Sequence, residues 1–447
     1  MASTSVQKNS GALHALKKVS LFPFIFVMYS YNTAGPFGLE DQVRVSGPGM
    51  ALIYQLVIPF FWCIPISLVA AELTSAMPVE GGFYRWSRAA FGDFWGFLAG
   101  WWNWCASFLL GGAYAVLFAD YVASYFPNLT PAEHYLIALS SVALIAYLNI
   151  RGIRLVGSVA TVLELSILAV IAVMCVMSVR LWHQNPFVPL IPPHKPIFQV
   201  FGVGFALGLW LYAGYEQMSS VAEEVEDPQR NYPKAVAWVV PLSIATYFLP
   251  TFCSLAALGH WEQWHDGYFA QAARLIGGPW LGLAMTLAGT AMSLSILNAM
   301  VLSTTRMPFA MAEDGYLSSA LARTHQKFGT PWLAILLSAV IYCLVAAHTL
   351  SQLISVYIWL RIATSIMTVV SAWQLRRKRP DLQRSFRIPW GKAGLAYAVI
   401  APLLMSGIAM TSSDRFALMW GPVALLLGPV AYFAFGRRQR SQLSEIS

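Results

Sequence analysis

Long, nearly uncharged apolar segments dominate this chain and limit what it can fold into. A helix needs about 20 mostly apolar residues to cross the hydrocarbon core of a bilayer. Twelve stretches of that kind are present, at 19–43, 48–76, 93–125, 131–149, 154–181, 197–222, 232–259, 279–312, 330–348, 350–375, 391–411 and 414–436. Only 11% of the 447 residues are charged, against about 25% in soluble domains. The sequence therefore predicts an all-α, multi-pass membrane protein in a lipid bilayer, and excludes a soluble enzyme or a nucleic-acid-binding protein.

The positive charges predict how the twelve spans are oriented. If the amino terminus is cytoplasmic, the tails 1–17 and 437–447 and the loops on their side hold 22 of the 28 Lys and Arg residues. Five lie on the other side, and Arg361 lies inside a span. Because cytoplasmic loops carry the excess of Lys and Arg, we expect both termini in the cytoplasm. A single membrane domain is then expected over 18–436.

No motif in the sequence predicts catalysis, a metal site or a cofactor. The five cysteines lie in apolar stretches without metal-ligand or CxxC spacing. HExxH, GxSxG and paired aspartates within a span are absent. We therefore expect no enzyme activity, metal, cofactor or disulfide framework.

Two of the twelve spans are interrupted by small residues at membrane depth. The first contains Asn32-Thr33-Ala34-Gly35-Pro36-Phe37-Gly38, and the sixth contains Gly208-Leu209-Trp210-Leu211-Tyr212-Ala213-Gly214-Tyr215-Glu216. Because the breaks lie five spans apart, equivalent helices of the two halves run in opposite directions. Interrupted segments at matching places in two halves indicate the binding site of a transporter. The predicted substrate-binding residues are Ala34, Gly35, Pro36, Phe37, Gly38, Trp210, Tyr212, Ala213, Gly214 and Tyr215.

The backbone groups freed by each break are suited to the charged ends of a small solute. After the first break, the amino end of the outer half-helix directs N–H groups and partial positive charge at the cavity, which suits a carboxylate. Pro36 has no N–H, so one donor is missing. The carbonyls that end the first half of span six are expected to be unpaired acceptors for an ammonium group. Aromatic side chains flank both breaks and offer faces on which a cation can rest.

Four acidic residues, three beside the breaks and one in span five, are candidates for function. A carboxylate near the centre of a membrane helix usually has a functional or pairing reason. We interpret Glu216, which opens the second half of span six, as a proton-linked gate or a cation partner. Glu164 in span five is a second proton site or a structural group bonded to a neighbouring hydroxyl. Glu40 and Asp41 lie in the first turn of the outer half-helix, where they stabilise its dipole or attract cationic substrates.

Motifs spread along the chain resemble those of the amino acid–polyamine–organocation (APC) transporters. They are Ala71-Glu72-Leu73 and the run from Met77 to Trp86, then Asn149-Ile150-Arg151-Gly152, the run from Glu223 to Ala235, Leu297-Asn298-Ala299, the run from Ala310 to Gly315, and Gly329-Thr330-Pro331. The resemblance covers nearly the whole chain. It implies a LeuT-like fold with broken helices 1 and 6, two inverted five-helix repeats at about 18–181 and 197–375, and two peripheral helices at about 391–436.

The resemblance also implies a secondary active transporter in the plasma membrane that moves an amine-containing solute by alternating access. The run from Gly35 to Asp41 looks most like the branch of polyamine uptake transporters and L-type amino acid permeases. Pro36 and the Glu40-Asp41 pair favour a polyamine as the solute. The polyamine branch commonly has an acid in span three, where this chain reads Phe108-Leu109-Leu110-Gly111-Gly112, and that absence favours an amino acid. Both alternatives stay open at this point.

The coupling ion and the mode of transport are also left as alternatives. Proton-coupled symport or exchange is the first expectation. A sodium-coupled or uncoupled amino acid exchanger is the second, because the run Ser303-Thr304-Thr305 lies near where sodium-using relatives place hydroxyl ligands. A transporter-like nutrient receptor or a channel is the alternative from a different class. The sequence does not indicate an oligomeric state.

Overall fold

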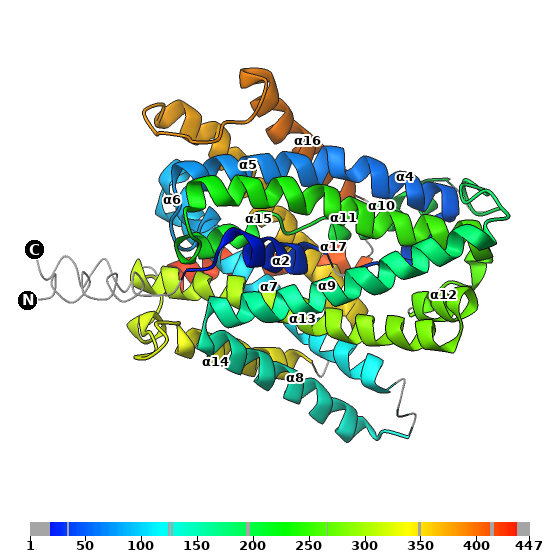
Figure 1. Cartoon of the computed structure of the whole chain (residues 1–447). Coiled ribbons are helices and arrows are strands. Elements are labelled where there is room, and N and C mark those ends of the chain that lie inside the picture. The colour runs from blue at the N-terminus through cyan, green and yellow to red at the C-terminus, as the bar shows by residue number, and fades with distance from the viewer. Residues whose placement is uncertain are drawn as a thin grey trace, which may run out of the picture.

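The computed structural model describes residues 18–33, 35–123, 126, 128–193, 197–265, 267–346, 350–411 and 415–435 (Figure 1). The first half of the chain forms five helical segments, which correspond to the first five predicted spans. They consist of α2 (Leu21–Asn32) with α3 (Glu40–Ser46), then α4 (Pro48–Ile58) with the π-helical turn η1 (Pro59–Cys63) and α5 (Ile64–Ala76), α7 (Asp93–Ala123), α8 (Pro131–Arg151), and α9 (Ile153–Ser178) with the 3₁₀ turn η2 (Val179–Leu181).

The second half repeats this order and adds two further helices. Its five spans consist of α10 (Ile197–Leu211) with the 3₁₀ segment η3 (Gln217–Glu224), α11 (Pro228–Leu258), α13 (Pro279–Glu313), α14 (Trp332–Val345) and α15 (Leu350–Lys378). The added helices are α16 (Gly391–Thr411) and α17 (Arg415–Phe435). Short elements connect the spans, namely α6 (Phe83–Phe91), η4 (Trp261–Gln263), α12 (Tyr268–Gly277) and η5 (Ser319–Ala322).

Helices at equivalent positions in the two halves pack against each other. α5 contacts α11, α7 contacts α13, and α8 contacts α14. α2 contacts α9, α11 and α13, which places the first half-helix in the interior of the bundle (Figure 1). α16 and α17 pack on the outside, against α5, α7 and α15. The predicted all-α fold, with two repeated halves, broken first and sixth helices and two peripheral helices, is confirmed.

Within the described residues, nine helices are long and apolar enough to cross a membrane. The remaining three predicted spans differ from these. The first and sixth are each broken into two short pieces, as predicted, and α14 has 14 residues. The number of twelve crossings therefore stays a prediction.

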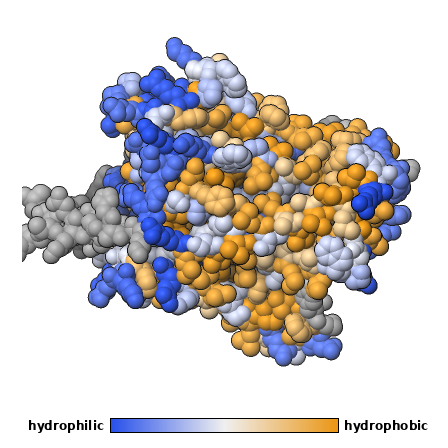
Figure 2. All heavy atoms as spheres, viewed as in Figure 1, coloured by the Kyte–Doolittle hydropathy of each residue, from blue (hydrophilic) through white to orange (hydrophobic). Residues whose placement is uncertain are grey.

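The bundle has two polar ends with an apolar belt between them (Figure 2). We call the end where α2 begins and α5, α13 and α15 finish the basic face, which carries Arg85, Arg88, Arg151, Arg376 and Arg384. The other end, which carries α3 and α12, is the opposite face. Large apolar side chains are exposed on the belt, among them Val176 on α9, Trp238 on α11, Leu344 on α14 and Leu426 on α17. Such a belt is suited to contact with lipid.

Candidate functional site

The first span is broken between Asn32 and Glu40, where the sequence predicts the break. Thr33 is extended, and Gly35 and Gly38 have φ of +70° and +88°. Glycine adopts this left-handed region without the strain that a side chain would introduce. These residues therefore turn the chain out of α2 and into α3. Ala34 was also predicted here and lies outside the described residues.

The second break meets the first in the interior of the bundle. α10 ends at Leu211 and η3 begins at Gln217. Gly214 between them has φ of +124°, and a Cβ added to it would lie 2.7 Å from Oδ1 of Asn32. The two interrupted segments are therefore in direct contact, and a residue larger than glycine at position 214 would clash with α2.

Tyr247 on α11 bridges the two breaks. Its hydroxyl lies 3.2 Å from the carbonyl of Asn32 and 3.0 Å from the carbonyl of Leu211. In the same stretch the N–H groups of Tyr212 and Ala213 donate to the carbonyls at positions 208 and 210. The prediction that the carbonyls ending the first half of span six are unpaired is therefore wrong at these positions. A carbonyl buried away from water needs a donor, and the fold supplies one.

A small cavity of about 20 Å³ lies between the breaks. Its lining consists of Tyr31, Asn32, Leu110, Tyr114, Trp210, Leu211, Ala213, Tyr247, Ile296 and Tyr357. A cavity of this size has room for about one water molecule. The binding site must therefore enlarge before it can hold an organic solute. Of the residues predicted to bind substrate, Trp210 and Ala213 line this cavity.

The other predicted aromatic residues lie around the cavity without lining it. The Tyr212 hydroxyl donates to the carbonyl of Gln55 at 2.8 Å, and the fully buried Tyr215 accepts a hydrogen bond on its own carbonyl. Phe37 packs edge-on against Tyr121 and Phe269, with ring centres 5.9 and 6.4 Å apart. Phe269 belongs to α12, so this aromatic cluster covers the cavity on the side of the opposite face.

Glu216, the predicted gate, forms a buried ion pair that the sequence did not reveal. Its Oε1 lies 2.8 Å from Nη2 of Arg361 and accepts a hydrogen bond from the Ser365 hydroxyl at 2.6 Å. Glu216 is completely buried, and Arg361 is 2% exposed. The sequence marks Arg361 as unusual because it is a cation within an apolar span. Its partner could not be identified without the packing of α15 beside the second break.

Glu164, the second predicted acid, lies on α9 in a buried environment. The hydroxyls of Ser295 and Ser30 are the polar groups that act on its carboxylate. The nearby hydroxyls of Ser30 on α2 and Ser295 on α13 bond to each other at 2.7 Å. Three spans therefore meet at an acid that has no ion-pair partner among the described residues.

Glu40 and Asp41 are placed differently although they are neighbours in the sequence. Glu40 is buried, and its Oε2 accepts a hydrogen bond from the N–H of Gly38 at 2.7 Å. Asp41 pairs with Arg44 at 2.6 Å on the partly exposed side of α3. The Glu40 contact favours the helix-stabilising alternative over cation attraction, because the carboxylate faces the free amino end of the half-helix.

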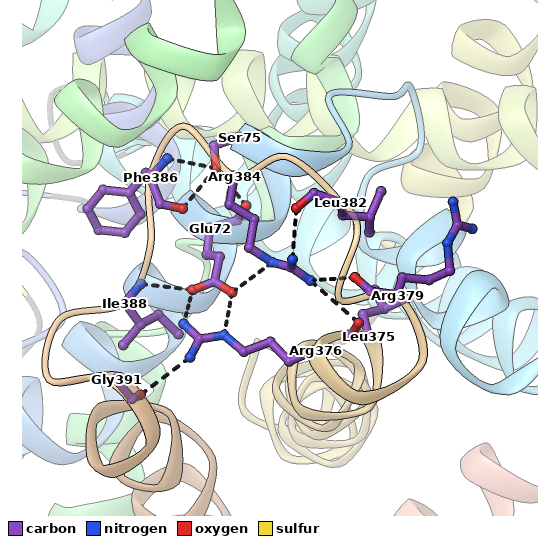
Figure 3. A network of polar contacts seen from close by, with 10 residues as sticks. All are labelled: Glu72, Ser75, Leu375, Arg376, Arg379, Leu382, Arg384, Phe386, Ile388 and Gly391. Atoms are coloured by element: carbon purple, nitrogen blue, oxygen red, sulfur yellow. Dashed lines mark hydrogen bonds and ion pairs between the residues drawn. The ribbon is translucent and has the colours of Figure 1, made fainter.

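Ion pairs hold the basic face together beneath the cavity. Glu72 at the end of α5 binds Arg376 through both carboxylate oxygens, accepts the N–H of Ile388 at 2.8 Å, and lies 3.3 Å from Nε of Arg384 (Figure 3). These contacts connect α5 to α15 and to the loop that follows it. Glu72 was noted in the sequence as part of a family motif, and its partners were not.

A second cluster on the basic face surrounds the loop between α5 and α6. Arg306 and Glu224, both buried, pair at 2.7 and 3.3 Å. Glu80 lies close to them in the loop, and its N–H donates to the carboxylate of Glu223 at 3.0 Å. Burial, followed by the negative charge of Glu224, raises the pKa of Glu80 well above its ordinary value, and Arg306 acts in the other direction.

The described residues contain no group of three or more His, Cys, Asp or Glu side chains that could hold a metal ion. The hydroxyls considered for sodium are engaged elsewhere. Ser303 donates to the carbonyl of Gln217 at 2.8 Å, and Thr304 lies 3.2 Å from the hydroxyl of Tyr342. The run at 303–305 therefore joins α13 to η3 and α14 on the basic side of the cavity.

Comparisons with known proteins agree on a transporter family. Residues 19–428 match the family model described as amino acid permease. A probable polyamine transporter of Arabidopsis thaliana is 32% identical over 422 residues, which cover 93% of this chain and 86% of the relative. The polyamine transporter PUT1 of Oryza sativa subsp. japonica is 31% identical over 434 residues, which cover 94% of this chain and 80% of the relative. An uncharacterized transporter of Mycobacterium tuberculosis is 28% identical over 323 residues, covering 70% of each chain.

The fold is similar to that of a solved structure. The crystal structure of MhsT in complex with L-phenylalanine superposes with a TM-score of 0.63, at 16% sequence identity. The match covers 88% of this chain and 99% of MhsT. At this identity the likeness establishes the LeuT-like fold alone.

Proposed function

This chain belongs to the amino acid permease family, and we propose that it is a secondary active transporter of small organic amines of the polyamine class. The observation that carries the proposal is the cavity at the junction of two broken helices. Breaks at matching places in inverted repeats are the binding sites of such transporters.

The lining of the cavity supports a cationic solute. Four tyrosines and Trp210 contribute to it, and aromatic faces attract ammonium groups. The ring of Trp210 also lies against the first break, 3.3 Å from a Cβ added to Gly38. A cation that enters the enlarged cavity would therefore meet aromatic rings from both broken segments.

The first break is poorly suited to hold the carboxylate of an amino acid. Pro36 has no N–H to donate, and the N–H of Gly38 already donates to Glu40. The Glu40 carboxylate would also repel a second carboxylate at the same helix end. This arrangement supports a polyamine, as do the names of the two plant relatives.

An amino acid is the second candidate, and one observation favours it. Arg361 places a guanidinium beside Glu216, and a guanidinium can bind a carboxylate in two-pronged geometry. In that case the pair would separate and hold the two charged ends of a zwitterion. The substrate panel below discriminates between the two classes.

We propose that transport is coupled to protons and that Glu164 carries the proton. Its carboxylate is buried with only the hydroxyls of Ser295 and Ser30 beside it and without an ion-pair partner among the described residues, and a charge there would be costly. Protonation removes that cost in one conformation, and access to water restores the charge in another. Glu216 is less suited to this task, since the guanidinium of Arg361 beside it favours its charged form.

We further propose that the protein resides in the plasma membrane with its basic face in the cytoplasm. The excess of Lys and Arg on one set of loops supports this orientation. A cysteine placed at the exposed Asp381 of the basic face should react with a membrane-impermeant thiol reagent only after cells are permeabilised. Reaction in intact cells would contradict the orientation.

The experiment for the proposed function is uptake into proteoliposomes under an inwardly directed proton gradient. The panel contains labelled putrescine, spermidine, arginine and leucine. We expect accumulation of the polyamines that exceeds that of leucine and collapses when the gradient is dissipated. Preferred uptake of leucine would favour the amino acid alternative, and binding or flux of none of the four would refute the proposal.

The role of Glu164 is tested in the same vesicles. Glu164→Gln should abolish gradient-driven accumulation and spare exchange of internal for external amine, because exchange needs no net proton movement. Glu133→Gln is the matched control, since Glu133 caps the exposed start of α8. Unchanged dependence on the proton gradient in Glu164→Gln would contradict this assignment.

A further inference from the structure

Arg361 is a positive charge that the chain keeps inside the membrane domain. It lies in the middle of α15 and is 2% exposed. Charged residues at this depth are costly and usually serve function, and a buried ion pair is weak evidence for a role in stability. The pair of Arg361 with Glu216 therefore calls for an explanation in terms of transport.

The pair lies at the basic-face end of the cavity. Tyr357, one helical turn before Arg361 on α15, lines the cavity, and so does Ala213, three residues before Glu216. Both segments run from the opposite face toward the basic face. A solute that moves through the cavity toward the basic face would therefore reach Glu216 and Arg361 next.

The contact between the two side chains is looser than in the buried pair of Arg306 with Glu224. Nη2 of Arg361 approaches Oε1 of Glu216 at 2.8 Å, but it is not in hydrogen-bond geometry, and Oε2 has no partner among the described residues. Nη1 of Arg361 reaches Oδ1 of Asn103 on α7 at only 3.4 Å. By contrast, Arg306 binds both oxygens of Glu224 through two hydrogen bonds. One oxygen of Glu216 thus remains available to a second cation.

We propose that Arg361 takes the place of the substrate's ammonium group at Glu216 and is displaced when an amine enters. This inference rests on the proposed function. The Glu216 carboxylate exchanges one cation for another, so it stays paired, and the displaced guanidinium moves toward Asn103 on α7. A guanidinium tethered to the chain is the competitor that the incoming amine must replace.

The exchange also provides a link between binding and opening. Glu216 belongs to the second broken segment, whereas Arg361 belongs to α15, which packs along α7. While the pair is intact it connects these two parts on the basic side of the cavity. Replacement of Arg361 by a free amine removes that connection, so substrate binding favours opening toward the basic face.

The test is equilibrium binding of labelled putrescine to the purified protein in detergent micelles. Arg361→Gln should lower the dissociation constant about tenfold, within the 5- to 150-fold range by which one interaction in a protein typically changes the affinity for another ligand. Glu216→Gln should weaken binding, and the double variant should bind like Glu216→Gln, since an arginine without its carboxylate has nothing to block. Arg306→Gln is the control for loss of a buried arginine and should not tighten binding.

A second variant keeps the proposal testable if Arg361→Gln does not fold. Arg361→Lys retains the charge but shortens its reach, and it should tighten binding by a smaller factor, about threefold. If wild-type protein binds putrescine and neither variant tightens it, the competition is refuted while the proposed function stands. If wild-type protein binds leucine and Arg361→Gln abolishes that binding, the arginine holds a carboxylate and the competition is likewise refuted. If no amine binds to wild type, the proposed function fails, and this inference fails with it.

Discussion

Glu72 is predicted to be a main support of the basic face, and Glu72→Gln tests this. The substitution keeps the size of the side chain and removes its charge. Three groups would lose a carboxylate partner, namely Arg376, Arg384 and the N–H of Ile388 (Figure 3). The Arg384 side chain is 4% exposed and the Arg376 side chain 20%, so water can compensate Arg376 better than Arg384.

The cost of this substitution follows from the contacts. Removal of one partner from a buried pair costs about 3–5 kcal/mol. A hydrogen bond from an amide to a charged acceptor contributes about 1.5–3 kcal/mol. Because these contacts share one carboxylate, they do not add fully, and the exposure of Arg376 reduces its share. We expect Glu72→Gln to lower the free energy of unfolding by about 3–5 kcal/mol.

The assay is denaturant-induced unfolding in detergent micelles, followed by thiol labelling of the fully buried Cys63. Asp381→Asn is the control, since the Arg379–Asp381 pair spans 3.7 Å with both side chains exposed. Exposed pairs are worth about 0–1 kcal/mol. If Glu72→Gln is no more destabilising than Asp381→Asn, the reasoning about this network is wrong.

Three further predictions concern the breaks and the loop before α6. Gly214→Ala should lower the melting temperature and abolish amine binding, because the added Cβ meets Asn32. Gly407→Ala, which has open space around the added Cβ, should change neither the melting temperature nor amine binding. Tyr247→Phe removes the hydroxyl between two buried carbonyls and should reduce the free energy of unfolding by about 1–3 kcal/mol; an unchanged value in a denaturant titration would contradict this. The pKa of Glu80 is raised in the folded protein. Its contribution to stability is therefore fully present below pH 4.5, the ordinary pKa of a glutamate, and is lost as the pH rises through the pKa of the folded state. Glu80→Gln should therefore reduce the loss of stability measured between pH 5 and pH 8, and an unaltered pH profile would count against this explanation.

The parts of the fold that depend on local sequence could be predicted. Spans require long apolar runs, and a break requires residues such as Gly35 and Gly214 that accept positive φ, so both are visible in the sequence. The excess of Lys and Arg on one set of loops is also visible and agrees with the basic face. The positions of the two breaks followed from the same signals, whereas their contact through Gly214 is visible only in the structure.

The partners of the charged groups could not be predicted, because they depend on how distant spans pack. Glu216 and Arg361 were both noticed as charges within spans, but nothing in either segment indicates that they meet. Tyr247 was missed because a tyrosine in an apolar helix carries no local signal of its two carbonyl partners. The cations around Glu72 were interpreted only as markers of orientation, since their fold back onto α5 is a tertiary event. Tyr212 and Tyr215 were grouped with Trp210 by sequence proximity, although their side chains leave the cavity in other directions.

Counterflow in proteoliposomes tests the central claim most directly. Vesicles are loaded with unlabelled putrescine, diluted into a trace of labelled putrescine, and followed over time without any ion gradient. An alternating-access carrier should produce a transient accumulation of label that rises with the internal concentration and then decays. Uptake that matches protein-free vesicles, or a flux that internal putrescine does not stimulate, would contradict an amine carrier built around the two broken helices.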